Sequence, residues 1–155
     1  MKRHTQVALG IGWFVAMVAL VAAADSTKDE AIKKDRARYE GTWRVVSLEV
    51  NGNKTPEEDA KKITVINHAD TWIVMAEGKE VAKGTSKIDP TKKPKTIDFT
   101  ATEGTDQGKV FLGIYEIEGN ARKLCFAQPG IDRPTEFASK PGSEHFLVVF
   151  ERVKK

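Results

Sequence analysis

Few side chains in this sequence have the type and spacing that catalysis or metal binding requires. His68 and Asp70 could supply two metal ligands, but a protein metal site takes three or four. We therefore expect the two residues to lie in a solvent-exposed turn. Glu116 and Glu118 would share one face of a strand, most simply the solvent face. No Gly-x-Ser-x-Gly or Ser-x-x-Lys motif marks a nucleophile. We therefore expect no catalytic residue, no metal site and no cofactor, and we do not expect an enzyme.

The densest positive cluster lies in the proline-containing loop Asp89–Lys95. Its lysines could hold an anion or an acidic partner at the mouth of a barrel. The favoured interpretation is that they are solvated residues that protect an edge strand from pairing with another chain. A second long loop, Gln128–Gly142, offers a further contact surface. The candidate loop contacts are Asp89, Lys92, Lys93, Lys95 and Arg133.

Short apolar stretches broken by Gly, Pro, Asn and Asp must position these side chains. The tight-turn dipeptide Asn51-Gly52 ends the first stretch, and Thr55-Pro56-Glu57-Glu58 is a capping box that predicts a short helix over Pro56–Lys61. The predicted strands are Gly41–Val50, Ile63–Asn67, Thr71–Glu77, Glu80–Ile88, Lys95–Thr102, Lys109–Glu118, Ala121–Ala127, Thr135–Phe137 and His145–Val153. Strands at this spacing with hairpin connections predict an all-β fold, an antiparallel barrel of eight or nine strands with one short helix.

The N-terminal segment differs from the rest of the chain. Lys2 and Arg3 precede an apolar stretch that ends in three alanines before Asp25, which is the pattern of a signal peptide cleaved after Ala24. An uncleaved membrane anchor is the alternative, since the stretch could just span a bilayer. We therefore predict a signal peptide over residues 1–24, a charged and possibly helical leader over 25–40, and a barrel domain over 41–155. The mature protein would be exported, periplasmic or extracellular, with no membrane span.

Charge and cysteine content restrict the function further. Two of the 25 Lys and Arg residues lie in the predicted signal peptide, and 22 Asp and Glu residues oppose the rest, so the mature net charge is near +1. That balance does not favour nucleic acid as a partner. Cys125 is the single cysteine, so no intramolecular disulfide can form and the domain depends on its apolar core. The thiol could be buried and inert, or it could be reactive.

Gly41 and Trp43 at the start of the first strand, with Arg152 near the end of the last, resemble the lipocalin (calycin) signature. More closely, the chain resembles an uncharacterised lipocalin-like family abundant in planctomycete bacteria. The segments that carry this resemblance are G-T-W-R-V-V-S-L-E from Gly41, D-P-T-K-K-P-K-T-I-D from Asp89, G-I-Y-E-I-E-G-N from Gly113, K-L-C-F-A from Lys123 and R-P-T-E-F from Arg133. The resemblance implies an exported barrel in which the Trp fills one end and the Arg packs across its indole. It implies no reaction.

Two functions follow from this fold. The first is an exported binding module that holds a small hydrophobic ligand inside the barrel. The second is an envelope structural or protein-interaction domain that acts through its loops without a ligand. The interior discriminates between them, because barrels of about eight strands can be filled by side chains or can hold one small ligand. Ala82, Gly84 and Gly113 could leave room inside, whereas Trp72, Phe99, Phe111 and Phe126 could fill it.

Overall fold

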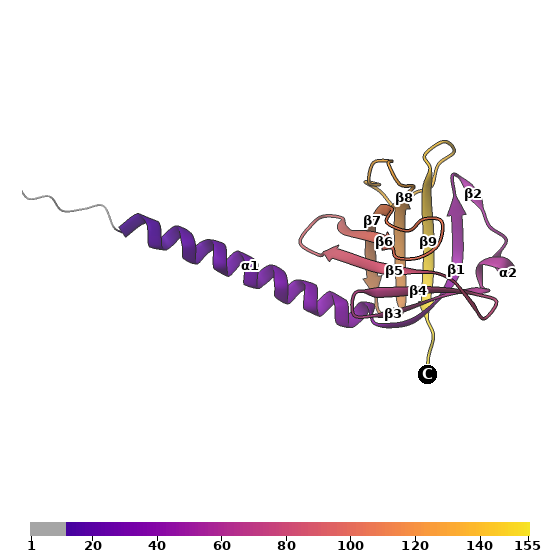
Figure 1. Ribbon diagram of the computed structural model, residues 1–155, viewed down its shortest axis with the longest axis horizontal. Helices are drawn as coiled ribbons and strands as arrows, with labels where there is room; N and C mark the ends of the chain where they lie inside the picture. The colour runs from indigo at the N-terminus through magenta and orange to yellow at the C-terminus, as the bar shows by residue number, and fades with distance from the viewer. Residues whose placement is uncertain (1–11) are drawn as a thin grey trace, which may run out of the picture.

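The computed structural model describes the backbone of residues 12–155 and the side chains from Ala23 onward. The predicted signal peptide, residues 1–24, therefore lies partly outside the described residues. From Gly12 the chain forms one helix, α1 (Gly12–Tyr39), which continues through the predicted cleavage point (Figure 1). Among the helices described, none is both long and apolar enough to cross a membrane.

A closed antiparallel barrel of eight strands follows α1 (Figure 1). Its strands pair in chain order, and the barrel closes because β1 pairs with β3 on one side and with β9 on the other. β2 is an additional short strand that pairs only with β1. The elements are β1 (Gly41–Val50), β2 (Asn53–Lys54), α2 (Glu57–Ala60), β3 (Ile63–His68), β4 (Thr71–Ala76), β5 (Lys79–Asp89), β6 (Lys95–Ala101), β7 (Val110–Glu118), β8 (Ala121–Ala127) and β9 (His145–Arg152).

The predicted all-β barrel with one short helix is confirmed, with one strand misplaced. Thr135–Phe137 is not a strand but part of the β8–β9 loop. The preceding Pro134 has no N–H for a ladder, and the Ala138 N–H donates locally to the Glu136 carbonyl at 3.0 Å. This loop covers the outer side of β8, where the Cys125 thiol lies 3.4 Å from the Ala138 carbonyl oxygen.

The C-terminal turns of α1 are fastened to one end of the barrel. The Asp35 carboxylate is buried and accepts hydrogen bonds from Lys95 Nζ at 2.7 Å and from the Tyr115 hydroxyl at 2.8 Å. Arg36 donates to the hydroxyl and the carbonyl of Ser86 on β5. The charged segment predicted as a leader is therefore the second half of α1, and its last turns pack against the barrel.

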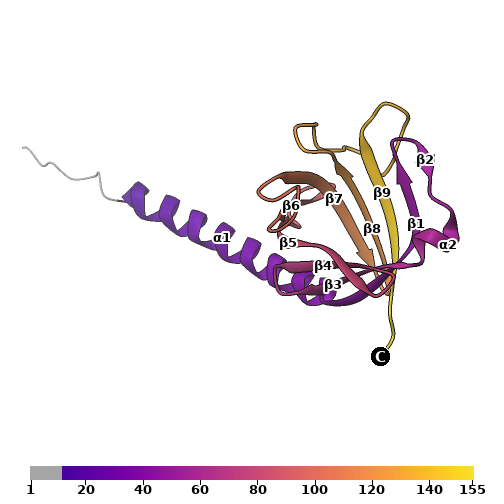
Figure 2. The same cartoon turned by 45° about the vertical axis from the view of Figure 1, so that its right-hand side comes forward.

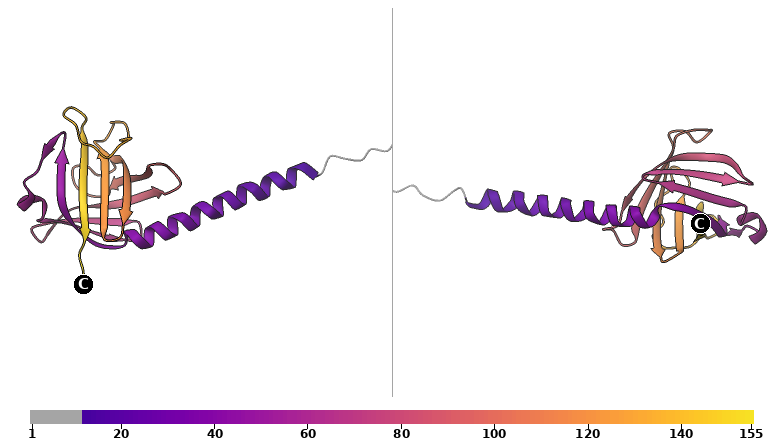
Figure 3. Two further views of the ribbon diagram at one scale, coloured as in Figure 1. Left: turned by 180° about the vertical axis from the view of Figure 1, so that it is seen from behind. Right: turned by 90° about the horizontal axis from the view of Figure 1, so that it is seen from below.

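Three views show how α1 and the strands are arranged. β3, β4 and β5 run across β1, β8 and β9, so that the two groups of strands enclose the interior (Figure 2). The C-terminus emerges at the end of the barrel where α1 arrives (Figure 3). We call this the closed end and define it by Tyr39, Trp43, Arg122 and Arg152, of which the first three are 0–1 % exposed.

Candidate functional site

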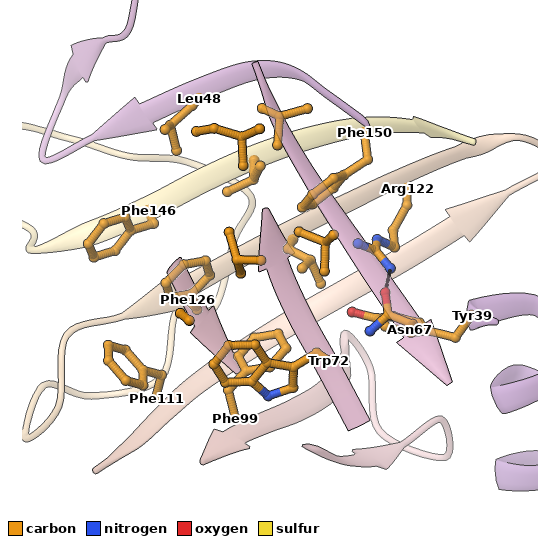
Figure 4. Close-up of a pocket in the computed structure, with 17 residues that line it drawn as sticks. Tyr39, Leu48, Asn67, Trp72, Phe99, Phe111, Arg122, Phe126, Phe146 and Phe150 are labelled. Carbon is orange, nitrogen blue, oxygen red and sulfur yellow. Dashed lines mark hydrogen bonds between the residues drawn. The ribbon is translucent and has the colours of Figure 1, made fainter. Parts of the chain in front are cut away.

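The barrel interior contains a cavity of about 280 Å³. Its volume lies just below the range of about 300–1,000 Å³ that is typical of small-molecule sites. Polar groups reach it only from the closed end, where Asn67, Arg122 and the hydroxyl-bearing Tyr39 line it (Figure 4). The remaining lining residues are apolar: Val45, Leu48, Ile63, Val65, Trp72, Val74, Ala82, Phe99, Phe111, Leu124, Phe126, Phe146, Val148 and Phe150.

Alternation along the strands places these side chains inside. On β8, Arg122, Leu124 and Phe126 point inward because successive residues of a strand face opposite sides. The end of the cavity away from Arg122 is lined by Phe111, Phe126 and Phe146, which we call the aromatic end (Figure 4). These three rings are half-buried, whereas Tyr39, Trp43 and Arg122 at the closed end are fully buried.

The aromatic end is organised by ring contacts. Phe126 stacks on Phe146 with a centroid distance of 4.7 Å and meets Phe111 edge-on at 6.2 Å. Phe99 continues the cluster, 5.7 Å from Phe126 and 6.2 Å from Trp72. Such contacts hold the rings in place, so this wall of the cavity is formed before any ligand arrives.

Two glycines expected to leave room inside do not do so. A Cβ built on Gly84 would lie 1.9 Å from the Thr100 carbonyl oxygen and 2.5 Å from the Trp72 ring. A Cβ on Gly113 would lie 2.9 Å from Phe126 Cβ. Both glycines permit close packing, and of the three small residues Ala82 alone lines the cavity.

Gly41, Trp43 and Arg152 meet at the closed end. The Arg152 guanidinium carbon lies 4.2 Å from the centroid of the Trp43 ring, and its two terminal nitrogens donate to the Glu40 and Arg38 carbonyls, each at 2.6 Å. Gly41 has a φ of +113°, and a Cβ there would lie 3.1 Å from the Arg152 guanidinium. Glycine is therefore required where the chain leaves α1 and enters β1.

Arg122 lies on the cavity side of the same indole. Its side chain is 1 % exposed, and its guanidinium carbon lies 4.2 Å from the Phe150 centroid, 4.4 Å from that of Tyr39 and 4.6 Å from that of Trp43. One terminal nitrogen donates to Asn67 Oδ1 at 2.7 Å. Nε and the other terminal nitrogen have no partner, and among the described side chains no carboxylate lies within 4.0 Å. Burial lowers the pKa of Arg122 to about 10, so the group is charged at neutral pH.

Tyr39 contributes a second unmet donor. It is 1 % exposed, its ring packs edge-on to Tyr115 at 5.8 Å, and its hydroxyl has no hydrogen-bond partner. Burial raises the pKa of Tyr39, which keeps the phenol protonated and able to donate. A buried cation and a buried phenol therefore lie at the closed end of a cavity whose wall is otherwise apolar.

The candidate loop contacts do not form one surface. Asp89 and Lys95 pair with α1, with Lys28 at 3.1 Å and Asp35 at 2.7 Å, and Lys92 and Lys93 are exposed in the loop beside them. This loop joins β5 to β6 at the closed end, so the predicted location at a barrel mouth is wrong.

Arg133 lies in the other predicted contact loop, between β8 and β9. It pairs with Asp98 at 2.7 Å and donates to the Gly113 carbonyl at 2.7 Å and the Ile97 carbonyl at 3.2 Å. These bonds fasten the β8–β9 loop to the outside of β6 and β7. Arg133 is therefore engaged within the chain and is only half-exposed.

The reactive groups outside the cavity, the Cys125 thiol and His68, make contacts within the protein. Burial raises the pKa of the Cys125 thiol, which disfavours the reactive thiolate. His68 is exposed and contacts the Glu40 carboxylate at 2.5 Å. Within residues 23–155 no three His, Cys, Asp or Glu side chains come together as metal ligands.

Comparison with known proteins adds no assignment to this geometry. No protein-family model, no curated protein and no solved structure matches the chain. The cavity and its two ends are therefore the observations on which a function can be argued.

Sequence reasoning missed Arg122 and Tyr39, although one signal was present. In Ala121–Ala127 the period of two places Arg122 on the same face as Leu124 and Phe126, which is the apolar, inward face. A charged residue on that face marks either a barrel end or a ligand contact. Tyr39 carried no comparable signal, because it belongs to a charged segment outside the strands.

Proposed function

We propose that this protein is a binding module that holds one small hydrophobic ligand inside its β-barrel, and that it acts after export. The observation that supports binding is the cavity of about 280 Å³, whose wall is apolar except at the closed end. Burying an apolar ligand there would gain roughly 25 cal/mol for each Å² of apolar surface removed from water. The N-terminal sequence supports export, and the lipocalin-like resemblance is consistent with a carrier of this kind.

The shape of the site supports a single, preferred ligand orientation. The closed end is sealed by buried side chains, and the aromatic end is half-exposed, so a ligand would enter between the aromatic rings. The rings hold one another in position, which lowers the entropy cost of forming the site on binding.

A neutral fluorescent probe tests this proposal. We expect N-phenyl-1-naphthylamine to bind the full chain saturably, one molecule per barrel. Ala82→Trp should lower its affinity at least about tenfold, because the new ring occupies the cavity that Ala82 lines. The matched control is Ala121→Trp, at an exposed position on β8. Absence of saturable binding, or equal effects of the two variants, would contradict a binding barrel.

A further inference from the structure

The donors at the closed end of the cavity indicate the chemical class of its ligand. Arg122 is buried, charged and has two N–H-bearing nitrogens without partners. An unpaired buried charge is strongly unfavourable even after relaxation, and three aromatic rings offset only part of this cost. Among the described residues no carboxylate pairs with the Arg122 guanidinium.

The comparison with Arg152 shows that the unmet donors do not follow from packing on Trp43. Arg152 also lies over this indole, but its terminal nitrogens are both satisfied by carbonyls. Arg122 points into the cavity, where the chain offers Asn67 Oδ1 as acceptor. Its free nitrogens are buried at the closed end, next to the space that a ligand would occupy.

The donor set fits an acid group. A guanidinium can give two parallel N–H bonds to a carboxylate, and such charge-assisted bonds are about twice as strong as neutral ones. The Tyr39 hydroxyl, which also lines the cavity and lacks a partner, can donate a third bond. Among the described side chains no carboxylate competes for these donors, so an acid from outside would complete the arrangement.

We propose that the ligand is an amphipathic organic acid, whose acid group binds Arg122 and Tyr39 while its alkyl tail extends to the aromatic end; this rests on the proposed function. Figure 4 shows Arg122 and Tyr39 at one end of the cavity and Phe111, Phe126 and Phe146 at the other. Between them the wall consists of aliphatic and aromatic side chains, which suits an unbranched hydrocarbon chain. The ligand's charge would neutralise the buried guanidinium.

Three probes with the same twelve-carbon chain separate the contribution of charge from that of apolar contact. Dodecanoate, dodecanol and dodecylammonium would be titrated into the full chain by calorimetry. We expect dodecanoate to bind at least about tenfold more tightly than dodecanol, and dodecylammonium to bind most weakly because Arg122 repels it.

Arg122→Met tests whether this preference comes from Arg122. The variant should lose the preference, so that dodecanoate binds at least about tenfold more weakly while dodecanol changes by less than about threefold. Retained dodecanol binding also shows that the variant folds with an accessible cavity. The matched control is Arg44→Met, since Arg44 lies on the outside of β1 and pairs with Glu151. It should leave both affinities unchanged.

Each outcome distinguishes the two proposals. If none of the three probes binds, the proposed function as a binding module is wrong, and so is the proposal of an acid ligand. If dodecanol binds and dodecanoate binds no more tightly, or if Arg122→Met still prefers dodecanoate, the proposal of an acid ligand is overturned and the proposal of an apolar binding site stands. Should Arg122→Met fail to fold, the ranking of the three probes on the natural chain still decides the question.

Discussion

Two arginines, Arg152 and Arg122, lie over the indole ring of Trp43, at 4.2 and 4.6 Å from its centroid. Arg152 is partly exposed, comes from the last strand and donates to two carbonyls at the junction of α1 and β1. Arg122 is fully buried, lines the cavity and leaves two nitrogens unpartnered. The same aromatic contact thus accompanies opposite hydrogen-bonding states. The difference is consistent with Arg152 as a residue that stabilises the fold and with Arg122 as a contact of the proposed acid ligand.

Removing the shared ring should have the largest effect. Trp43 is 0 % exposed and its indole N–H donates to the Tyr39 carbonyl at 3.0 Å. Trp43→Ala should lower the free energy of unfolding by about 4 kcal/mol, since it leaves a large cavity beneath both arginines. Urea denaturation measures this loss. Trp43→Phe should cost less than half as much, and equal effects of the two variants would contradict a packing role for the indole.

The stabilising role of Arg152 predicts the next largest effect. Arg152→Met should cost about 2–3 kcal/mol, because it removes two charge-assisted hydrogen bonds and the contact with Trp43. Arg152→Lys should cost less, because it keeps the positive charge, but it should not restore full stability, because an ammonium cannot reproduce the planar fork of the guanidinium. An unchanged denaturation midpoint for Arg152→Met would remove the contrast between the two arginines.

The same substitution at Arg122 should have almost no effect on stability. Arg122→Met removes an unpaired buried charge, which is favourable, but leaves Asn67 Oδ1 without its donor. We expect the free energy of unfolding of the ligand-free protein to change by less than about 1 kcal/mol. The double variant Arg122→Met/Asn67→Leu should be at least as stable as the natural chain. A loss similar to that of Arg152→Met would mean that Arg122 is a structural residue.

The smallest effect concerns Glu40, whose carbonyl is one of the two acceptors for Arg152. Its carboxylate accepts the Ala69 N–H at 2.9 Å and contacts His68, and these two bonds lower the pKa of Glu40 below its ordinary value of 4.5. The unfolded chain therefore takes up this proton first as the pH falls. The stabilisation is present above pH 4.5 and is lost as the pH falls through the lowered folded value.

Glu40→Gln isolates this contribution. The difference in free energy of unfolding between the natural chain and the variant should be constant above pH 4.5 and shrink below it. Denaturation series at several pH values measure the difference. A difference independent of pH would show that the carboxylate contributes nothing through ionisation.

The barrel was predictable from local patterns. Turn residues such as Asn51-Gly52 and Gly119-Asn120 separate apolar runs, and the predicted bounds of Gly41–Val50 and Ala121–Ala127 match β1 and β8. Alternation along a strand is a local property, so it can be read without knowing the neighbours. Thr135–Phe137 was misread because three residues after a proline, with Phe137 as their one apolar side chain, carry no register information.

The site was less predictable because it depends on pairs of residues far apart in the chain. Tyr39 and Arg122 are separated by more than half of the barrel strands, and only closure brings them together. One of the two interpretations of the lysines near Asp89 put them at a barrel mouth, but the number of residues in a loop does not reveal which barrel end it occupies. Whether Gly84 leaves space or admits a neighbour likewise depends on Trp72, from the adjacent strand.

The position of Cys125 makes the opening of the β8–β9 loop measurable. Its side chain is 0 % exposed beneath the β8–β9 loop, with Sγ 3.4 Å from the Ala138 carbonyl oxygen, and it is the one thiol in the sequence. A thiol-specific reagent can reach it only when the loop lifts from β8 or the barrel unfolds. The rate of alkylation therefore measures how often these openings occur, and it can be measured on the natural protein. If a molecule in the cavity changes this rate, the occupancy of the barrel interior affects the opening of the loop outside it.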